Sequence, residues 1–475
     1  MKIPSYRIPV SMKSSKFDRR SFLGRTVAGT AVIASSGLVS RVDAAVTPEP
    51  AKERSGENVI KADVLVVGGG SAGHVAAIQA ARAGASTIVV ERNSQLGGTT
   101  TTAGVSFPGL YHAWGKQIIA GIGWELVTET VKLNGETLPD FAQVPDKHWK
   151  HQVFLNGQLY ALLAEDACLE AGVSLAYYQF VHKLRSSDDG WLVDIMGQGV
   201  QYTIACKQII DCTGGAEVVG MAGFERVRSD IRQPGTLIFK IGGIDRKKLN
   251  KAAIQKEYQK AIADGRLIKG DCANGNMHSF LMGGGENNNH IFGADSATAG
   301  TQTQANLAGR KSLMRLLKFI RKLPGGENAT IEKMMQETGI RETSRIVGET
   351  TLTVNDYKSG RMFDDAVCYS FYPIDVHDEH GVKPEPLSPD TFPTIPLGSL
   401  IPKDSRNIIV AGRCLSSDRL ANSAARVQAS CMAMGQAAGA TAALAAKRGA
   451  TPLNVPIADI RNLLREHSAI IPGEI

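Results

Sequence analysis

The chain has 475 residues, of which 43% are hydrophobic and 50 are glycine, so it can bury a large core and we expect two subdomains. Its formal net charge of +7 raises the question of nucleic-acid binding, but the first 44 residues hold eight Lys and Arg against two Asp, a net charge of +6. The rest of the chain carries only about +1, so we expect no nucleic-acid partner.

A basic leader opens the chain. Its RRSFL motif at residues 19–23 is typical of a twin-arginine export signal and precedes a weakly apolar stretch at 26–40 and a V-x-A cleavage site at 42–44. Such a stretch is too short and too polar to cross a bilayer, so we expect no stable membrane span. We predict a signal peptide at 1–44, a linker at 45–60 and export to the periplasm or secretion. The alternative is a disordered basic tail.

An apolar run followed by glycines begins a dinucleotide-binding unit. The run at 62–67 predicts a strand buried on both faces, and GGGSAG at 68–73 supplies the G-x-G-x-x-G spacing. Gly68 allows a tight turn, Gly70 the close approach of a pyrophosphate, and Gly73 the packing of helix on strand.

The unit continues with a helix predicted at 75–83 and a strand at 87–90 that leads into Glu91. A carboxylate at this point can accept both hydroxyls of the adenosine ribose. We expect contacts with the nucleotide half of the cofactor from Gly68, Gly70, Ser71, Ala72, Gly73, Glu91 and Arg92.

A second glycine pair at 97–98 favours FAD over NAD, because it lets the backbone approach the cofactor again beyond its adenosine half. Two later strands, at 208–211 and 407–411, each end in a turn that brings backbone close to a ligand. Further FAD contacts are expected from Gly97, Gly98, Thr213, Gly214, Gly412 and Arg413.

A helix dense in alanine and glycine is predicted at 426–447, with Gly435 and Gly439 approaching the sheet. The N–H groups near Val427 and Gln428 would favour an anionic reduced flavin at its pyrimidine edge. The alternative is a helix with a packing role only. At the other end of the cofactor, the backbone at Val181 is expected to border the adenine.

The chain resembles the bacterial FAD-dependent oxidoreductase family with a glutathione-reductase-type flavin fold. The matching motifs are ERNSQLGG from residue 91, IIDCTGGAEVVG from 209, RETSRIVGETTLTVND from 341, FYPIDVH from 371 and NIIVAGRCLSSDRLANSAARVQASCMAMGQAAG from 407. The resemblance implies an α/β protein with an FAD/NAD(P)-binding Rossmann-like domain and places the 426–447 helix beside the flavin ring. His74 departs from the small residue that is usual there, and we expect it to pack or to face solvent.

The order of the motifs predicts three segments after the linker. Residues 61–220 form the first part of the FAD-binding domain, and 339–475 form the second part with the C-terminal helices. The block at 221–338 interrupts the nucleotide-binding pattern, so we assign it as an inserted substrate-side domain.

The FYPIDVH segment supplies the strongest candidates for a base. Strand alternation places Asp375 and His377 on one face, where the carboxylate can orient the imidazole. Removal of a hydride from an alcohol or amine needs a base for the second proton. We therefore predict His377 as this base, with a buried structural pair as the equal alternative.

Arg341 and Arg345 are four residues apart and would share a helix face, where two guanidinium groups can hold a carboxylate substrate. The competing interpretation pairs them with Glu342 and Glu349 in a salt-bridge network.

These features predict an exported flavoenzyme that dehydrogenates a small organic substrate by hydride transfer to flavin N5. Its electrons would pass to a respiratory acceptor or to oxygen. The alternatives are a flavin-dependent reductase of an oxidised or unsaturated compound and a flavin electron carrier without its own substrate. The seven cysteines lack C-x-x-C spacing and the ten histidines lack zinc spacing, so we expect no metal, and we expect His148 and His151 at the surface.

Overall fold

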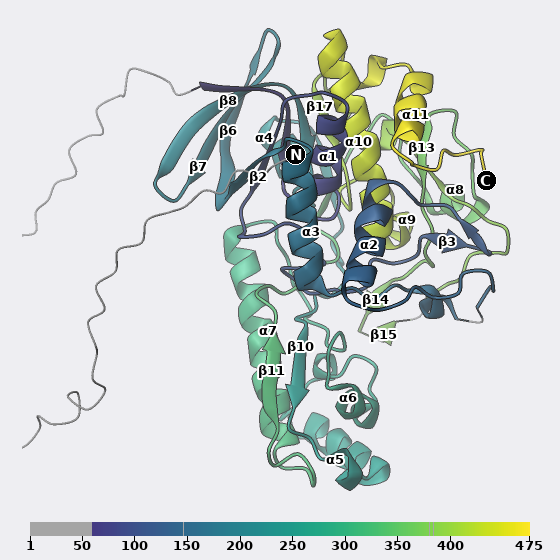
Figure 1. The fold of residues 1–475 in the computed structure, drawn as a ribbon. Coiled ribbons are helices and arrows are strands. Elements are labelled where there is room, and N and C mark those ends of the chain that lie inside the picture. Colours follow the sequence, from purple (N-terminus) through teal and green to yellow (C-terminus); the bar gives the residue numbers. More distant parts are fainter. Residues whose placement is uncertain (1–58, 146, 380, 383) are drawn as a thin grey trace, which may run out of the picture. The chain divides into compact units, whose positions relative to one another are not determined.

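The largest sheet has seven strands (upper left of Figure 1) in the computed structural model, which describes residues 59–145, 147–379, 381–382 and 384–475. The strand order is β5-β2-β1-β8-β7-β6, and β17 also pairs with β8. The strands are β1 (Val59–Val67), β2 (Thr87–Glu91), β5 (Ser174–Tyr177), β6 (Gln179–Ser187), β7 (Gly190–Gly197), β8 (Val200–Asp211) and β17 (Ile408–Val410). The predicted signal peptide lies outside the described residues.

Five of these strands, β5, β2, β1, β8 and β17, run parallel to one another. The apolar run of β1 is buried on both faces, as its sequence predicted: Val64 and Val66 belong to one core cluster, whereas Leu65 and Val67 belong to another. The fold is therefore α/β with a Rossmann-like sheet.

β8 is longer than the predicted strand because it takes part in two kinds of pairing. Residues Val200 to Cys206 pair antiparallel with β7, and Ile209 to Asp211 pair parallel with β17. Only the second part gave a clear apolar signal in the sequence. The first part depends on the β7–β8 hairpin, in which polar and apolar residues mix.

Helices α1 and α10 pack side by side against this sheet (Figure 1). A Cβ atom on Gly435 would lie 2.2 Å from the carbonyl oxygen of Ala72, and one on Gly439 would lie 2.3 Å from that of Ala76. The two glycines therefore bring α10 onto the backbone of α1, not onto the sheet as we predicted. The longer helices that share this core are α1 (Gly73–Arg82), α2 (Ile122–Leu133), α3 (Gly157–Glu170), α10 (Gln428–Arg448) and α11 (Ile457–Glu466).

A further group of elements has its own apolar cluster, which includes Phe239, Phe280 and Leu316 (lower part of Figure 1). The group consists of β10 (Phe239–Gly242), α5 (Lys251–Ala263), α6 (Met277–Gly283), α7 (Ala299–Ile320) and β11 (Thr330–Met334). It follows the first part of the sheet in the chain and precedes β17.

Short elements complete the described structure. They are β3 (His112–Ala113), β4 (Lys116–Gln117), α4 (Glu217–Met221), β9 (Arg226–Arg228), β12 (Ser344–Ile346), α8 (Val354–Ser359), β13 (Ala366–Tyr369), β14 (His377–Asp378), β15 (Gly381–Val382), β16 (Thr394–Pro396) and α9 (Arg419–Ala425). Within the described residues, no helix has both the length and the apolar character needed to cross a membrane.

Candidate functional site

The glycines of the first loop have three different surroundings. Gly68 has a φ of +95°, and a Cβ there would lie 2.7 Å from the carbonyl oxygen of Cys212. A Cβ on Gly73 would lie 1.8 Å from the carbonyl oxygen of Gly68, whereas one on Gly70 would meet no atom within 4 Å. The packing of the protein itself thus requires Gly68 and Gly73, while Gly70 borders open space where a ligand can approach the backbone.

The second glycine pair closes this loop from another side. Gly97 donates its N–H to the carbonyl oxygen of Gly69 at 2.9 Å and forms a parallel bridge with Gly70. A Cβ on Gly98 would lie 3.0 Å from the Cα atom of Gly70. The two loops together form a cradle of backbone that suits a pyrophosphate.

Glu91 lies beside this cradle at the end of β2 and is buried. Its carboxylate accepts the N–H groups of Gly69 at 2.7 Å and Asn93 at 2.8 Å. Burial raises the pKa of Glu91, and these two hydrogen bonds oppose that effect. The remaining lone pairs can accept ribose hydroxyls. The Arg92 side chain is 51% exposed and forms an ion pair with Glu337 at 3.7 Å.

Asp211 and Arg413 hold the turn that follows β8. The Asp211 carboxylate accepts the N–H of Thr213 at 3.0 Å and its hydroxyl at 2.7 Å. Arg413 donates to the carbonyl oxygens of Gly214 at 2.8 Å and Ile340 at 3.0 Å. Arg413 therefore joins three segments of the chain and fixes the loop in which it lies.

The start of α10 is tied to both cofactor loops. The Oε1 atom of Gln428 accepts hydrogen bonds from the hydroxyls of Thr100 and, at 2.9 Å, Ser71. Its Nε2 atom donates to the carbonyl oxygen of Val105 at 2.9 Å. Val427 occupies the N-cap position and provides no capping side chain, and the first turn contains no acidic residue. The N–H of Ala429 donates to the carbonyl oxygen of Pro108 at 2.8 Å. Gly412, with φ of +102°, precedes Arg413 at the end of β17.

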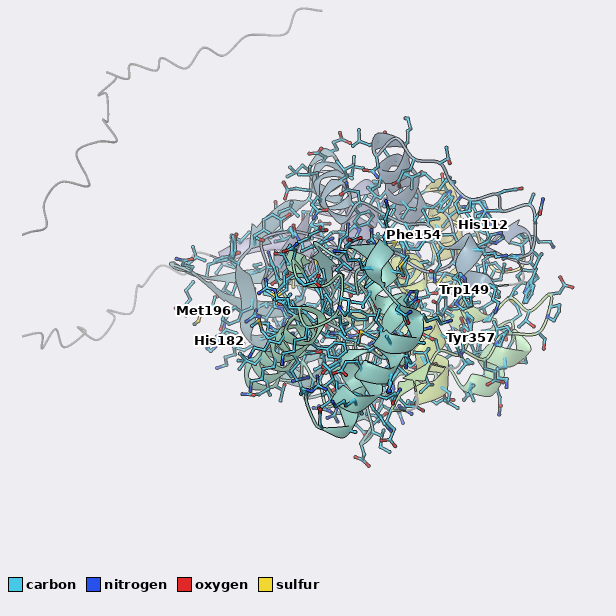
Figure 2. The ribbon with its side chains drawn as sticks, turned by 90° about the horizontal axis from the view of Figure 1, so that it is seen from below. His112, Trp149, Phe154, His182, Met196 and Tyr357 are labelled. Carbon is cyan, nitrogen blue, oxygen red and sulfur yellow. The ribbon has the colours of Figure 1, made fainter. Side chains whose placement is uncertain are left out.

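The register of β6 against β7 shifts between Val181 and Lys183, so His182 is an extra residue at the position predicted for the adenine. His182 and Trp149 lie on opposite sides of Figure 2. The end of the expected cofactor path at which the adenine is predicted, near His182, is therefore far from Trp149.

An aspartate and two histidines form a chain of polar contacts. Nε2 of His377 lies 3.1 Å from Oδ2 of Asp375, and its Nδ1 lies 3.0 Å from Nε2 of His290. The side chains of His377 and Asp375 are 14% and 13% exposed. The two residues of the FYPIDVH motif thus meet as strand alternation predicted, although Asp375 lies just before β14.

Two arginines act on the same aspartate. Arg426, two residues before α10, lies 3.5 Å from Oδ2 of Asp375 and donates to its carbonyl oxygen at 3.2 Å. Arg341 donates to the carbonyl oxygen of Pro234 at 2.6 Å and to the Thr236 hydroxyl at 3.0 Å. We call the following residues the histidine-arginine cluster: His290, Arg341, Asp375, His377 and Arg426.

The helix predicted for Arg341 and Arg345 is wrong, because Arg345 lies in β12, whose backbone is extended by pairing with β9. Arg345 donates to the carbonyl oxygen of Ser417 at 3.0 Å and to the Ser229 hydroxyl at 3.2 Å. Among the described residues, neither arginine forms an ion pair with the two glutamates of the competing interpretation.

The electrostatics of the cluster keep both histidines neutral at pH 7. Burial and the charge of Arg341 lower the pKa of His377 to about 4 and that of His290 to about 3. Burial and the like charge of Arg426 lower the pKa of Arg341 to about 9, so this guanidinium remains charged. Burial raises the pKa of Asp375, but the hydrogen bond from His377 and the two arginines outweigh it, and the net pKa is below its ordinary value.

Aromatic residues connect the cluster to the start of α10. The hydroxyl of Tyr372 accepts a hydrogen bond from Gln152 at 3.1 Å, and the His148 ring packs edge-on at a centroid distance of 5.3 Å. A Cβ on Gly109 would lie 3.9 Å from Tyr372 and 3.2 Å from Val427. The cluster therefore adjoins the helix end that the sequence assigns to the flavin.

Three histidines are less exposed than predicted. His74 is fully buried, with Nδ1 2.7 Å from the carbonyl oxygen of Gly70 and Nε2 2.9 Å from the Tyr160 hydroxyl. It has a packing role, and the solvent-facing alternative is wrong. The surface location predicted for His151 is also wrong, because it is 8% exposed, whereas His148 is partly exposed and packs on a tyrosine.

Other features of the described residues lie outside this cluster. All seven cysteines are free thiols. No group of three or more His, Cys, Asp or Glu side chains in the described ranges is arranged to hold a metal ion. A cleft of about 400 Å³ borders the β9–β12 pair, and its polar lining residues are Glu217, Arg226, Arg228, Ser296, Thr343 and Ser344.

Sequence reasoning missed His290 and Arg426. His290 follows the stretch GGGENNN, which has no periodicity and no recognisable motif. Arg426 did carry a signal, since it is a cation directly before the helix end assigned to the flavin. Its role was hidden because its partner Asp375 is distant in the sequence.

Comparisons with known proteins identify a family over most of the chain. The family described as FAD dependent oxidoreductase matches residues 63–464. Among solved structures, a geranylgeranyl bacteriochlorophyll reductase-like protein from Thermoplasma acidophilum is 13% identical with a TM-score of 0.42, and the match covers 86% of this chain and 84% of that chain.

Curated relatives match only locally. Pseudooxynicotine dehydrogenase of Pseudomonas sp is 40% identical over 87 residues, which is 18% of this chain and 18% of that protein. Nicotine dehydrogenase of Pseudomonas putida (strain DSM 28022 / S16) is 34% identical over 118 residues, 22% of this chain and 24% of that protein. Mitochondrial dihydrolipoyl dehydrogenase of Caenorhabditis elegans is 49% identical over 51 residues, 11% of this chain and 10% of that protein. Each match therefore spans less than a quarter of the relative.

Proposed function

The chain belongs to the FAD-dependent oxidoreductase family, and we propose that this FAD enzyme dehydrogenates a small organic substrate at the histidine-arginine cluster. The glycine loops fit the cofactor, since a Cβ on Gly70 would enter open space and Gly98 approaches the Gly70 backbone closely. When bound, FAD accepts a hydride at flavin N5. The residues that would hold it are Gly68, Gly70, Ser71, Ala72, Gly73, Glu91, Gly97, Gly98, Val181, Thr213, Gly214, Gly412, Val427 and Gln428.

His377 is the base in this proposal. The observation that carries it is a neutral, largely buried imidazole, held at 3.1 Å by Asp375 and at 3.0 Å by His290. Both ring nitrogens of His377 are engaged in these contacts, but two neutral imidazoles carry one proton fewer than the contacts can hold. The His377–His290 pair can therefore take up the proton that leaves a substrate hydroxyl or amine as its C–H bond is broken. Arg341 is placed to hold the substrate, whereas Arg345 and Arg413 support the surrounding loops.

The same observation favours dehydrogenation over the reductase alternative. The lowered pKa values of His377 and His290, about 4 and about 3, keep both imidazoles at neutral pH in the unprotonated form that accepts a proton. An electron carrier has no need of a buried base. We propose a respiratory acceptor or oxygen as the final destination of the electrons.

Three further proposals concern architecture and location. The domain is of the glutathione-reductase type, and residues 221–338 form the substrate-side insertion, which is supported by the separate core of α5, α6 and α7 and by the position of His290. The RRSFL motif supports twin-arginine export of the FAD-loaded protein to the periplasm.

Anaerobic flavin absorbance tests the proposed direction. The FAD-loaded enzyme is mixed with hydroxy acids, sugars and amines, including nicotine, and loss of the oxidised flavin band reports dehydrogenation. We expect at least one compound to bleach the flavin. If none does, while a chemically reduced enzyme is reoxidised by an unsaturated compound, the enzyme is a reductase.

A further inference from the structure

The histidine-arginine cluster holds more positive than negative charge. It contains two guanidinium groups, Arg341 and Arg426, and one carboxylate, Asp375, which lies 3.5 Å from Arg426. Arg426 and Asp375 are also the charged residues that act most strongly on Arg341. The next described carboxylate along the chain, Asp378, is exposed and acts on His290.

The two histidines do not change this balance, because both are neutral at pH 7. The described part of the cluster therefore carries one net positive charge. The side chains of Arg426 and Asp375 are only 12% and 13% exposed, so water screens this charge poorly. A buried net charge is costly, and an anion bound at the cluster would reduce that cost.

Arg426 also has a hydrogen-bond donor without an acceptor. One terminal nitrogen donates to Gln233 and to the Asp375 carbonyl oxygen, each at 3.2 Å. The Nε atom is buried and has no partner. Guanidinium groups bind carboxylates through two parallel N–H bonds, which would satisfy this donor.

We infer that the cluster binds a monoanionic substrate through its carboxylate, which Arg341 and the unpartnered Nε side of Arg426 hold beside His377. This inference rests on the proposed function and specifies its substrate class. A hydroxy acid suits this site, because its carboxylate can pair with the arginines and its hydroxyl proton can be taken up by the His377–His290 pair.

The same charges oppose a cationic substrate. Nicotine dehydrogenase acts, by its name, on an amine, but its match covers only 22% of this chain. A protonated amine would be repelled by two guanidinium groups and attracted by only one carboxylate. The substrate class of that relative is therefore not expected here.

Calorimetric titration of the FAD-loaded enzyme tests the inference without turnover. The probes are two matched pairs, acetate with acetamide and benzoate with benzamide, which differ mainly in charge. We expect the carboxylate of at least one pair to bind at least about 10-fold more tightly than its amide. Arg426→Gln and Arg341→Gln should each weaken carboxylate binding roughly 10- to 100-fold and leave amide binding unchanged.

Two further variants control this comparison. Arg426→Lys keeps the charge but loses the fork and should show a smaller loss than Arg426→Gln. Arg465→Gln removes a distant arginine that pairs with Glu474 and is 49% exposed, and it should bind carboxylates as the wild type does. The flavin absorbance spectrum checks that each variant retains FAD. If Arg426→Gln loses FAD, carboxylate binding by Arg341→Gln tests the inference instead.

The inference would be overturned if each carboxylate bound no more tightly than its amide. It would also be overturned if Arg465→Gln weakened carboxylate binding as much as Arg426→Gln and Arg341→Gln do. The outcome is separable from that of the proposed function. If nicotine or a sugar bleaches the flavin while no carboxylate binds, the dehydrogenase proposal stands and the anionic substrate does not. If carboxylates bind through the arginines but no compound bleaches the flavin, the anion site stands and the dehydrogenase proposal fails.

Discussion

The Nε2 atom of His290 lies 3.0 Å from the Nδ1 atom of His377, and this contact limits how many protons the two rings can share. The two rings form a row of hydrogen bonds. At one end of this row His377 contacts the Asp375 carboxylate, and at the other end His290 hydrogen-bonds to the backbone of Asp378. Three hydrogen bonds between two terminal acceptors need three ring protons, but two neutral imidazoles provide only two. Uptake of one proton by the two rings would allow all three hydrogen bonds to form at once, which suits a histidine pair that accepts a proton from a substrate.

His377→Gln and His290→Gln should each slow flavin reduction by substrate roughly 10²-fold or more, because each removes part of the proton acceptor. Anaerobic stopped-flow absorbance measures this rate, and the loss should shrink as pH rises where hydroxide can replace the base. His278→Gln, on α6 outside the cluster, is the matched control and should react at the wild-type rate. Unimpaired reduction with lowered thermal stability would assign the pair a structural role.

Gly70→Val should lose FAD, and Gly70→Ala should lose less, because a side chain here enters the space left for the pyrophosphate. Gly70→Ala should not disturb the polypeptide, since a Cβ at this position meets no protein atom within 4 Å. The ratio of flavin to protein absorbance measures occupancy, and circular dichroism measures folding. Gly73→Ala provides the contrast: it should impair folding itself, because its Cβ would lie 1.8 Å from a carbonyl oxygen. Full occupancy in Gly70→Val would contradict the assigned cofactor path.

His74 should make the enzyme less stable in mild acid. Burial lowers its pKa in the folded protein to about 4, below the ordinary value of 6.5, so the unfolded chain binds more protons between these values. The stability from neutral His74 is complete above about pH 6.5 and is lost as pH falls towards about 4, amounting to up to about 3 kcal/mol. Urea unfolding at pH 7 and pH 4.5 should show a smaller acid-induced loss for His74→Gln than for wild type. An equal loss in both proteins would show that His74 does not set this dependence.

Gly435→Ala should destabilise the fold by about 1–3 kcal/mol, because its Cβ would lie 2.2 Å from the Ala72 carbonyl oxygen at the contact of α1 with α10. The melting temperature should fall, and FAD retention with it. Gly300→Ala is the matched change in a helix with room, as its Cβ would meet only the Thr298 hydroxyl at 3.7 Å. This control should be neutral or stabilising. A similar melting temperature for both variants would argue against close helix contact.

Replacement of Arg19 and Arg20 by lysine should trap a full-length precursor in the cytoplasm, because the twin-arginine route requires the arginine pair. Cell fractionation with detection of the protein measures the distribution. An unchanged periplasmic yield would leave the leader as a general signal or a tail.

The sequence allowed the prediction of elements whose signals are local. The strand, glycine loop, helix and second strand from Val59 to Glu91 follow from apolar runs and glycine spacing within a short stretch. The partners of β8 and the strand at Arg345 could not be predicted in this way. Ile346 is 1% exposed and β12 pairs with β9, so a contact from far along the chain overrides the helical spacing of the two arginines.

In the candidate site, too, contacts between residues close in the sequence could be predicted, and contacts between distant residues could not. Asp375 and His377 are two residues apart, so their contact is local and could be predicted from the sequence, although only His377 lies in a strand. His290 contacts His377 from the loop between α6 and α7, and no sequence motif near His290 predicts this contact. The contact of Arg426 with Asp375 could not be predicted, because it forms only when the start of α10 packs against the loop that contains Asp375.

The contact between α1 and α10 also sets the order of events during synthesis. The glycine loop and α1 leave the ribosome early, but Gly435 and Gly439, which seat α10 against them, follow roughly 350 residues later. At about 5–20 residues per second, the nascent glycine loop waits roughly 20–70 s for the helix that completes its surroundings. During that interval the apolar side chains of α1 lack their final cover and are open to chaperones. FAD can therefore be locked in place only when translation of the chain is almost finished.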